Sequence, residues 1–225
     1  ADEKSLVKLD WIINEDHRAS LRWNKTKGNQ PQFSEYDDFS SSQPETNLTS
    51  HWYTDNRTNE SVVFQMFSNW GDNWRTEFRY GQSEFISLPG NPNVFPEIVI
   101  DDFPGTTRSG APTSRGELYF GRDDSRHSNE LATDVTNIYL AADDFTGDHT
   151  ITFGFDREES DFVNLFLQQT FGEMTFDNVA DFYADEIQFF RRSVGVDGVP
   201  LAAESDFTTN GLFIQDTWDV NNRLT

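Results

Sequence analysis

The chain has 225 residues, of which 35% are hydrophobic, and a formal net charge of -22. This length allows a sizeable core in one or two domains, but the hydrophobic share and the mean hydropathy of -0.68 are low for a packed soluble globule. The acidic balance argues against a nucleic-acid partner, because phosphate binding uses clustered Lys and Arg. The lack of cysteine is compatible with export, and no stretch approaches the roughly 20 apolar residues of a membrane helix.

Alternating apolar and polar residues predict a series of strands along the chain. The expected strands lie near residues 5–13, 18–26, 61–70, 74–86, 129–144, 149–171 and 211–220. Short acidic turns separate them, at residues 14–17 (NEDH), 71–74 (GDNW) and 147–149 (GDH), with 221–223 (NNR) after the last strand. The sequence therefore predicts an all-β fold of antiparallel, up-and-down strands.

Three long polar segments interrupt the strands, at residues 27–59, 88–128 and 172–210, and they are expected to be loops. Short turns at one end of the strands and long loops at the other are typical of an outer-membrane β-barrel. The third segment contains a short helix predicted over residues 177–184, capped by Asp177 or Asn178.

The turn centred on Asp72 predicts a specific strand register. Trp70 then lies opposite Trp74, and Phe64 lies opposite Tyr80, so the large apolar side chains share one face. The other face of the hairpin is polar. A slip by one residue would scramble both faces, so the register is well specified.

The other two turns predict registers in the same way. A first turn centred on Asp16 pairs Trp11 with Leu21. Around the third turn the best match sets Ala142 against Phe153. In a barrel the apolar faces contact lipid, and the residues expected there include Leu9, Trp11, Leu21, Trp23, Phe64, Met66, Phe78 and Tyr80.

Tryptophans gather near the turns, as aromatic side chains do at membrane–water interfaces. The expected interface residues are Trp11, Trp23, Trp70, Trp74 and Trp218. The alternative is that these side chains fill the core of a soluble sandwich.

Loop aromatics are the expected ligand contacts, because flat rings supply contact area at low entropic cost. The candidates are Tyr36, Phe39, Trp52 and Tyr53. They could equally pack the loops against one another.

No catalytic, cofactor or metal site is expected. The chain has no H-E-x-x-H, no glycine-rich phosphate loop and no G-x-S-x-G. Four Asp-Asp pairs occur, at residues 37–38, 101–102, 123–124 and 143–144. They are interpreted as solvated loop acids, because calcium needs six or more oxygen ligands, which a pair cannot supply.

Two C-terminal runs carry a family resemblance: residues 172–182 (GEMTFDNVADF) and 211–225 (GLFIQDTWDVNNRLT). They resemble the barrel of TonB-dependent outer-membrane receptors, in particular the Oar-like group. Residues 148–154 (DHTITFG) are similar to an earlier turn and strand of the same barrel. The resemblance implies that the short turns are periplasmic, that the long loops are extracellular, and that the protein lies in the outer membrane of a Gram-negative bacterium.

Receptors of that family also have an N-terminal plug, a TonB box and a barrel of about 22 strands. The whole chain, residues 1–225, is therefore expected to be a partial barrel domain in which the plug and the TonB box are not represented. The resemblance implies outer-membrane lipid and the TonB complex as partners, the latter through parts outside this chain, together with a small-molecule, glycan or peptide ligand.

Three functions stay open on the sequence. The first is a receptor that binds a ligand at its extracellular loops and passes it through the barrel. The second is a soluble all-β module that binds carbohydrate or another ligand. The third is a non-transporting outer-membrane adhesin.

Overall fold

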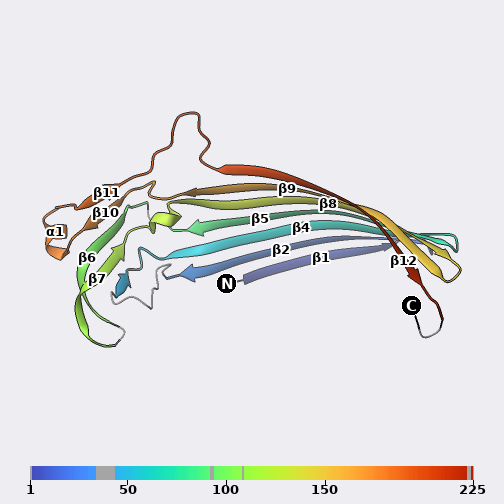
Figure 1. The fold of residues 1–225 in the computed structure, drawn as a ribbon, viewed down its shortest axis with the longest axis horizontal. Helices are drawn as coiled ribbons and strands as arrows, with labels where there is room; N and C mark the ends of the chain where they lie inside the picture. Colours follow the sequence, from blue (N-terminus) through green and yellow to red (C-terminus); the bar gives the residue numbers. More distant parts are fainter. Residues whose placement is uncertain (1, 34–43, 92–93, 108, 222–223, 225) are drawn as a thin grey trace.

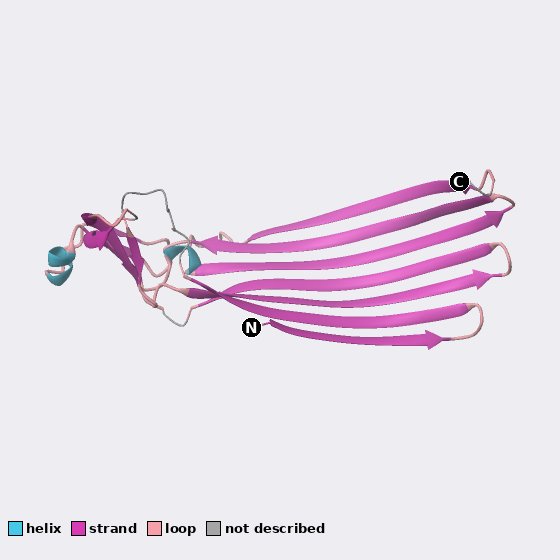
Figure 2. Ribbon diagram, turned by 90° about the horizontal axis from the view of Figure 1, so that it is seen from below, coloured by secondary structure: helices cyan, strands magenta, loops and turns pink. Residues whose placement is uncertain are grey.

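Seven long antiparallel strands form an open sheet, here called the wall sheet (Figures 1 and 2). The structure is a computed structural model that describes residues 2–33, 44–91, 94–107, 109–221 and 224. The strands of the wall sheet, in spatial order, are β1 (Asp2–Ile12), β2 (His17–Gln32), β4 (Tyr53–Trp70), β5 (Trp74–Gly90), β8 (Ser128–Thr146), β9 (His149–Leu167) and β12 (Ala203–Trp218). Each strand runs antiparallel to its neighbours, which confirms the up-and-down fold.

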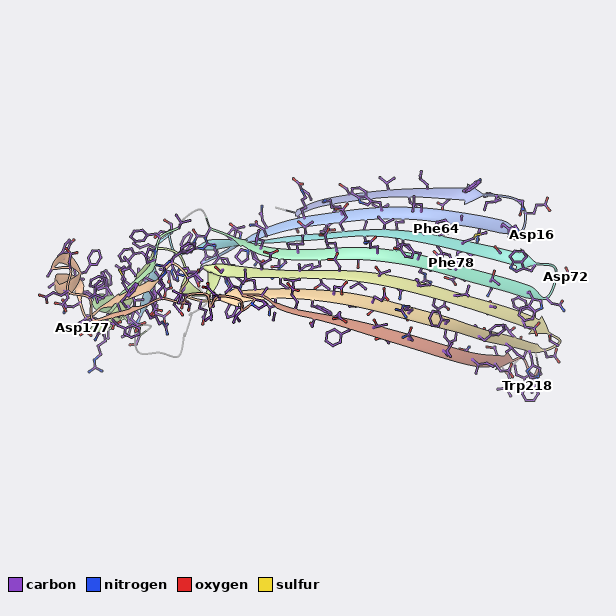
Figure 3. All side chains as sticks on the ribbon, turned by 90° about the horizontal axis from the view of Figure 1, so that it is seen from above. Asp16, Phe64, Asp72, Phe78, Asp177 and Trp218 are labelled. Atoms are coloured by element: carbon purple, nitrogen blue, oxygen red, sulfur yellow. The ribbon has the colours of Figure 1, made fainter. Side chains whose placement is uncertain are left out.

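The short turns all lie at one end of the wall sheet, here called the turn end. In the first turn the side-chain oxygen of Asn14 accepts hydrogen bonds from the backbone N–H groups of Asp16 and His17, both at 2.9 Å. This local bonding is the reason that Asn favours turns. In the second turn Gly71 has a φ of 70°, a conformation that side chains with a Cβ resist. Asp16, Asp72 and Trp218 mark this end in Figure 3.

Two of the three predicted registers are confirmed. Trp70 pairs with Trp74 in the second hairpin, and Ala142 pairs with Phe153 in the third. The register of the first hairpin was wrong, because Trp11 pairs with Ala19 rather than with Leu21. The bonds made by Asn14 move the centre of the turn from Asp16 to Glu15, which shifts the pairing by two positions. A shift of two leaves every side chain on its predicted face.

One face of the wall sheet, here called the outer face, carries the apolar side chains. One row across the strands consists of Trp11, Ala19, Met66, Phe78, Leu140, Phe155 and Leu212. None of the eight residues predicted to face lipid is buried: five are exposed, while Trp23, Phe64 and Met66 are half-buried by neighbours on the same face. Figure 3 places Phe64 and Phe78 in the half of the strands nearer the turn end, and their ring centroids are 6.2 Å apart.

The long connections lie at the opposite end, and a second sheet, here called the cap sheet, forms from them (Figure 1). Its strands, in spatial order, are β11 (Phe189–Arg191), β10 (Glu173–Phe176), β6 (Glu97–Thr106), β7 (Pro112–Phe120) and β3 (Glu45–Asn47). The expectation of plain loops was therefore wrong. The wall strands are also longer than predicted, since β2 reaches Gln32 and β4 starts at Tyr53.

The cap, meaning the cap sheet and its connections, has a small core of its own. The buried side chains of Ile98, Ile100 and Phe176 form it, and Phe182 of helix α1 (Val179–Tyr183) packs against them. Asn178 caps α1 by accepting from the N–H groups of the first turn, which confirms one of the two predicted caps. A one-turn 3-10 helix, η1 (Asp124–Arg126), leads back into the wall. No helix in the described part of the chain is long and apolar enough to cross a bilayer.

Candidate functional site in the cap and on the inner face

The cap sheet joins three separate connections of the wall into one layer. Strand β3 comes from the connection between β2 and β4, β6 and β7 from that between β5 and β8, and β10 and β11 from that between β9 and β12. The joins between connections are parallel pairs, β3 with β7 and β10 with β6. Pairing holds the three connections together through backbone hydrogen bonds, so they form one surface above the wall.

The four predicted ligand contacts have different surroundings. Tyr36 and Phe39 lie outside the described residues. Trp52 is exposed, and its ring packs edge-on against Phe33 with centroids 4.9 Å apart. Tyr53 is buried beneath the guanidinium of Arg126, 4.9 Å from its ring centroid, which leaves little of Tyr53 for a ligand to touch.

Buried polar side chains gather where the cap meets the wall. His51, Glu97, Asp123 and Asp124, here called the junction cluster, have exposed fractions of 1%, 5%, 1% and 5%. The interpretation of the Asp-Asp pairs as solvated acids was therefore wrong for Asp123 and Asp124. The sequence carries no periodic signal for this burial, because these residues come from different connections and meet only after the cap folds.

Burial changes the protonation behaviour of the junction cluster. Desolvation, followed by the nearby Asp124 carboxylate, raises the pKa of Glu97 to about 8. Desolvation also raises the pKa of Asp123. For His51, desolvation outweighs the attraction of Asp124 and lowers the pKa to about 4. These opposite directions share one cause, which is that burial penalises the charged form of each group.

Arg191 forms ion pairs with buried acids of the cap. Its Nη2 lies 2.5 Å from Oε2 of the buried Glu173, and its Nε donates to the same oxygen at 2.7 Å. Nη2 is also 3.8 Å from Oδ2 of Asp124. Arg191 therefore connects the third connection to the junction cluster.

The face opposite the apolar one, here called the inner face, is polar. Arginines on this face are balanced by acids: Arg75 pairs with Asp143 at 2.7 Å, and Arg79 pairs with Glu77 at 2.7 Å. Arg22 and Arg79 also line a hollow of about 510 Å³ on this face. Such a surface fits a water-filled lumen.

An aromatic stack crosses the inner face close to that hollow. The Arg79 guanidinium lies 5.1 Å from the centre of the Tyr139 ring. Tyr139 in turn stacks on Phe213, with centroids 6.0 Å apart and ring planes at 19°. The stack reaches from β5 to β12 by passing over Gly154 of β9, where a Cβ would lie 2.4 Å from the Phe213 ring.

Tryptophans mark both edges of the apolar band on the outer face. Trp70, Trp74 and Trp218 are exposed at the turn end, whereas Trp11 lies four positions further along, in the row of Phe78. Trp23 lies at the other edge, in the same row as Gln82, which is eight positions beyond Trp74 on β5. Eight residues of strand span roughly 27 Å, or about 20 Å across a membrane at a strand tilt of about 40°. This height is close to the apolar band of outer-membrane barrels.

A row of acids follows immediately beyond Trp23 on the same face. Residues directly opposite one another in this row are Glu60, Glu84, Asp134, Asp161 and Asp206. Like charges directly opposite destabilise a sheet, and hydrocarbon would raise that cost further. The row therefore lies in water or among polar groups and sets the limit of the apolar band.

The family model described as an outer membrane beta barrel domain matches residues 1–225. The chain belongs to this family. It is therefore part of a protein of the outer membrane of a Gram-negative bacterium, and the soluble-module alternative is set aside. No curated protein matches the sequence.

Two solved structures are similar to the chain. The outer membrane transporter YddB from Escherichia coli matches with a TM-score of 0.63 and 12% identity, over 96% of this chain and 25% of its own. The ferric-catecholate import receptor Fiu from E. coli K12 matches with a TM-score of 0.37 and 14% identity, over 96% of this chain and 32% of its own. The first match supports the barrel fold. The chain spans about a quarter of the length of that transporter.

Proposed function

We propose that the chain forms a wall segment and the extracellular cap of a TonB-dependent outer-membrane receptor of the Oar-like group. This receptor binds a ligand at the cap and passes it through the barrel without covalent chemistry. The observation that carries the proposal is the joining of all three long connections into one cap sheet at the end opposite the short turns. A surface built in this way suits recognition, because rigid elements position contacts better than separate loops.

The polar inner face supports the transport part of the proposal. A lumen that conducts a solute needs polar groups and water along its wall, and Arg22 and Arg79 line a polar hollow there. Among the described residues, the outer edges of β1 and β12 pair with no further strand. This supports a larger barrel, because exposed strand edges in a membrane need further strands to satisfy their backbone groups.

The orientation can be tested by cysteine labelling, since residues 1–225 contain no cysteine and any cysteine elsewhere in the full-length protein can be replaced first. Tyr183 of α1 is 82% exposed in the cap, and Asp72 is exposed at the turn end. In the full-length protein, a membrane-impermeant maleimide should label Tyr183→Cys in intact cells. It should label Asp72→Cys only after the outer membrane is permeabilised. Labelling of Asp72→Cys in intact cells would overturn the orientation.

Ligand recognition can be tested with cells that carry the full-length protein. A panel of labelled iron chelates, glycans and peptides should give at least one compound that accumulates in a TonB-dependent manner. Removal of residues 94–122 should abolish its binding while leaving a heat-modifiable barrel in the membrane. Binding without TonB-dependent uptake would favour an adhesin, and turnover of the compound by the purified protein would contradict the absence of chemistry.

A further inference from the structure

The junction cluster holds polar atoms that have no hydrogen-bond partner although they are almost fully buried. These atoms are Nδ1 and Nε2 of His51 and Oδ2 of Asp123. Nδ1 lies 3.6 Å from Oε1 of Glu97, and Nε2 lies 3.8 Å from Oδ2 of Asp123, and both distances are too long for hydrogen bonds. Buried polar atoms without a hydrogen-bond partner are rare and destabilise the fold. We therefore expect a further group to bind between these three atoms.

The spacing of the cluster fits one cation. One carboxylate oxygen from each of Glu97, Asp123 and Asp124 lies within 4.8 Å of the others. Ligands bound to the same cation at about 2.0–2.2 Å lie roughly 3–4.4 Å apart, so small side-chain movements would bring all three into a shell. Nε2 of His51, 3.8 Å from Oδ2 of Asp123, already falls within that range, while Nδ1 faces Oε1 of Glu97 at 3.6 Å and is not a ligand of the same cation.

Charge also favours a cation. Four carboxylates, those of Glu97, Asp123, Asp124 and Glu173, are buried at this junction. Arg191 supplies one positive charge, which it places mainly on Glu173. The charged form of a buried carboxylate is stable when the group is paired or coordinates a metal.

The surrounding contacts hold the candidate ligands in place. Oδ1 of Asp123 accepts from the Ser125 N–H at 2.9 Å, which leaves Oδ2 facing the cluster. The Gln169 amide donates to Oδ2 of Asp124. If one His51 nitrogen binds a metal, the other stays beside a carboxylate, which is the usual second partner of a metal-bound histidine.

We propose that the junction cluster binds one divalent cation, Zn²⁺ or Mn²⁺, through Nε2 of His51 and one oxygen from each of the three carboxylates, while Nδ1 of His51 stays beside Glu97. The mixture of nitrogen and oxygen ligands favours these ions. Calcium takes six to eight oxygens, more than the cluster offers with one ligand atom per carboxylate. The cation links His51, from the first connection, to acids of the second. Gln169 and Arg191 of the third connection both contact Asp124, so the third connection is linked as well. The cation therefore holds the three connections of the cap together.

The test uses the full-length protein, purified in detergent and stripped of metal with a chelator. After incubation with Zn²⁺, Mn²⁺ or Ca²⁺ and gel filtration, elemental analysis measures the metal that is retained. Wild-type protein should retain about one equivalent of Zn²⁺ or Mn²⁺. Loss of a second-shell partner typically weakens metal affinity about 10- to 100-fold, so loss of a ligand in Asp123→Asn should weaken it at least about 100-fold.

Two further variants make the result decisive. Asp177→Asn removes an exposed acid elsewhere in the cap and should bind metal as the wild type does. His51→Gln keeps all three carboxylates and should still lower retention. Each variant is first checked for a heat-modifiable barrel, and trypsin cleavage of the cap is compared with and without the metal. Metal should protect the wild-type cap and leave the Asp123→Asn cap unprotected.

The proposal is wrong if wild-type protein retains neither Zn²⁺ nor Mn²⁺, or if it retains Ca²⁺ in preference to both. It is also wrong if folded Asp123→Asn and His51→Gln retain as much metal as the wild type. These outcomes do not depend on the transported ligand. Failure of the metal proposal would therefore not contradict the proposed receptor function, which is tested separately.

Discussion

The indole Nε1 of Trp23 donates a hydrogen bond to Oε1 of Glu60 across the β2–β4 pair, at 2.8 Å. The ring lies against the apolar band, while the N–H turns towards the row of acids that begins with Glu60. A tryptophan with one apolar side and one bonded N–H is suited to a membrane–water boundary. We therefore expect the membrane boundary at the cap end of the outer face to run between these two side chains.

Arginine substitution on the outer face should be costly in the middle of the apolar band. Phe64→Arg or Phe78→Arg should lower the unfolding free energy of the full-length protein in vesicles by about 2 to 4 kcal/mol, because the charge enters hydrocarbon. Glu84→Arg, in the acid row, is the matched control and should cost about 0 to 1 kcal/mol. Reversible unfolding in denaturant measures the difference. Equal stability of all three variants would contradict the lipid-facing assignment.

A methyl group at Gly154 should disrupt the aromatic stack of the inner face. Its Cβ would lie 2.4 Å from the Phe213 ring and 2.6 Å from the backbone oxygen of Leu140. Gly154→Ala should therefore destabilise the barrel by about 1–3 kcal/mol, the usual cost of overpacking. Gly81→Ala, where the nearest atom is 3.9 Å away, should be nearly neutral. Adding Phe213→Ala should recover only part of the loss, because the clash with the Leu140 oxygen stays.

The stability of the cap should depend on pH through His127. Nε2 of this buried ring bonds to the Arg122 carbonyl at 2.9 Å, and Nδ1 accepts from the Phe171 N–H at 3.3 Å, so the neutral form satisfies both atoms. Burial lowers the pKa of His127 below its ordinary value. The unfolded state then binds the proton more readily, and stability should fall as the pH drops below about 6.5.

Trypsin cleavage of the cap as a function of pH measures this effect. His127→Gln can still donate to one carbonyl and accept one N–H, but it does not titrate. This variant should lose part of the acid sensitivity between about pH 6.5 and 5. His149→Gln, at the turn end, should keep the wild-type profile of the cap. An unchanged profile in His127→Gln would exclude His127 as the titrating group.

The three connections should lose protection together. Strands β3 and β10 join the cap sheet through β7 and β6, so removing residues 94–122 leaves both without these partners. Trypsin should then cleave the connection between β9 and β12 much faster. Removing the exposed residues 196–199 is the control, because they lie outside the cap strands, and it should leave β3 and β6 protected. Independent protection of each connection would argue against a single cap.

The wall could be predicted from the sequence because its signal is local. Alternation fixes which face each side chain occupies, and the tight turns fix the pairing to within two positions. The error at Trp11 arose because a shift of two satisfies the same pattern, and the choice depends on the bonds of Asn14. The helix cap at Asn178 could also be predicted, because the capping side chain bonds to a backbone N–H only three positions further along the chain.

The cap and the junction cluster could not be predicted in the same way. The parallel pair of β6 with β10 joins residues more than seventy positions apart, and no turn connects them. The one available signal was the apolar run Ile98, Val99 and Ile100, which is typical of a strand buried on both faces. His51 and Asp123 meet only because the cap sheet exists, so their burial depends on contacts that the local pattern does not contain.

The parallel pairs of the cap also determine the order in which the cap and the wall can form. Strand β6 can pair with β10 only after β8 and β9, which lie between them in the chain, have been synthesised. Pairings between distant segments form slowly, because the loop must close before any contact compensates for the lost entropy. The cap should therefore mature after the wall strands have entered the membrane, so the wall can be inserted before the end opposite the short turns is covered.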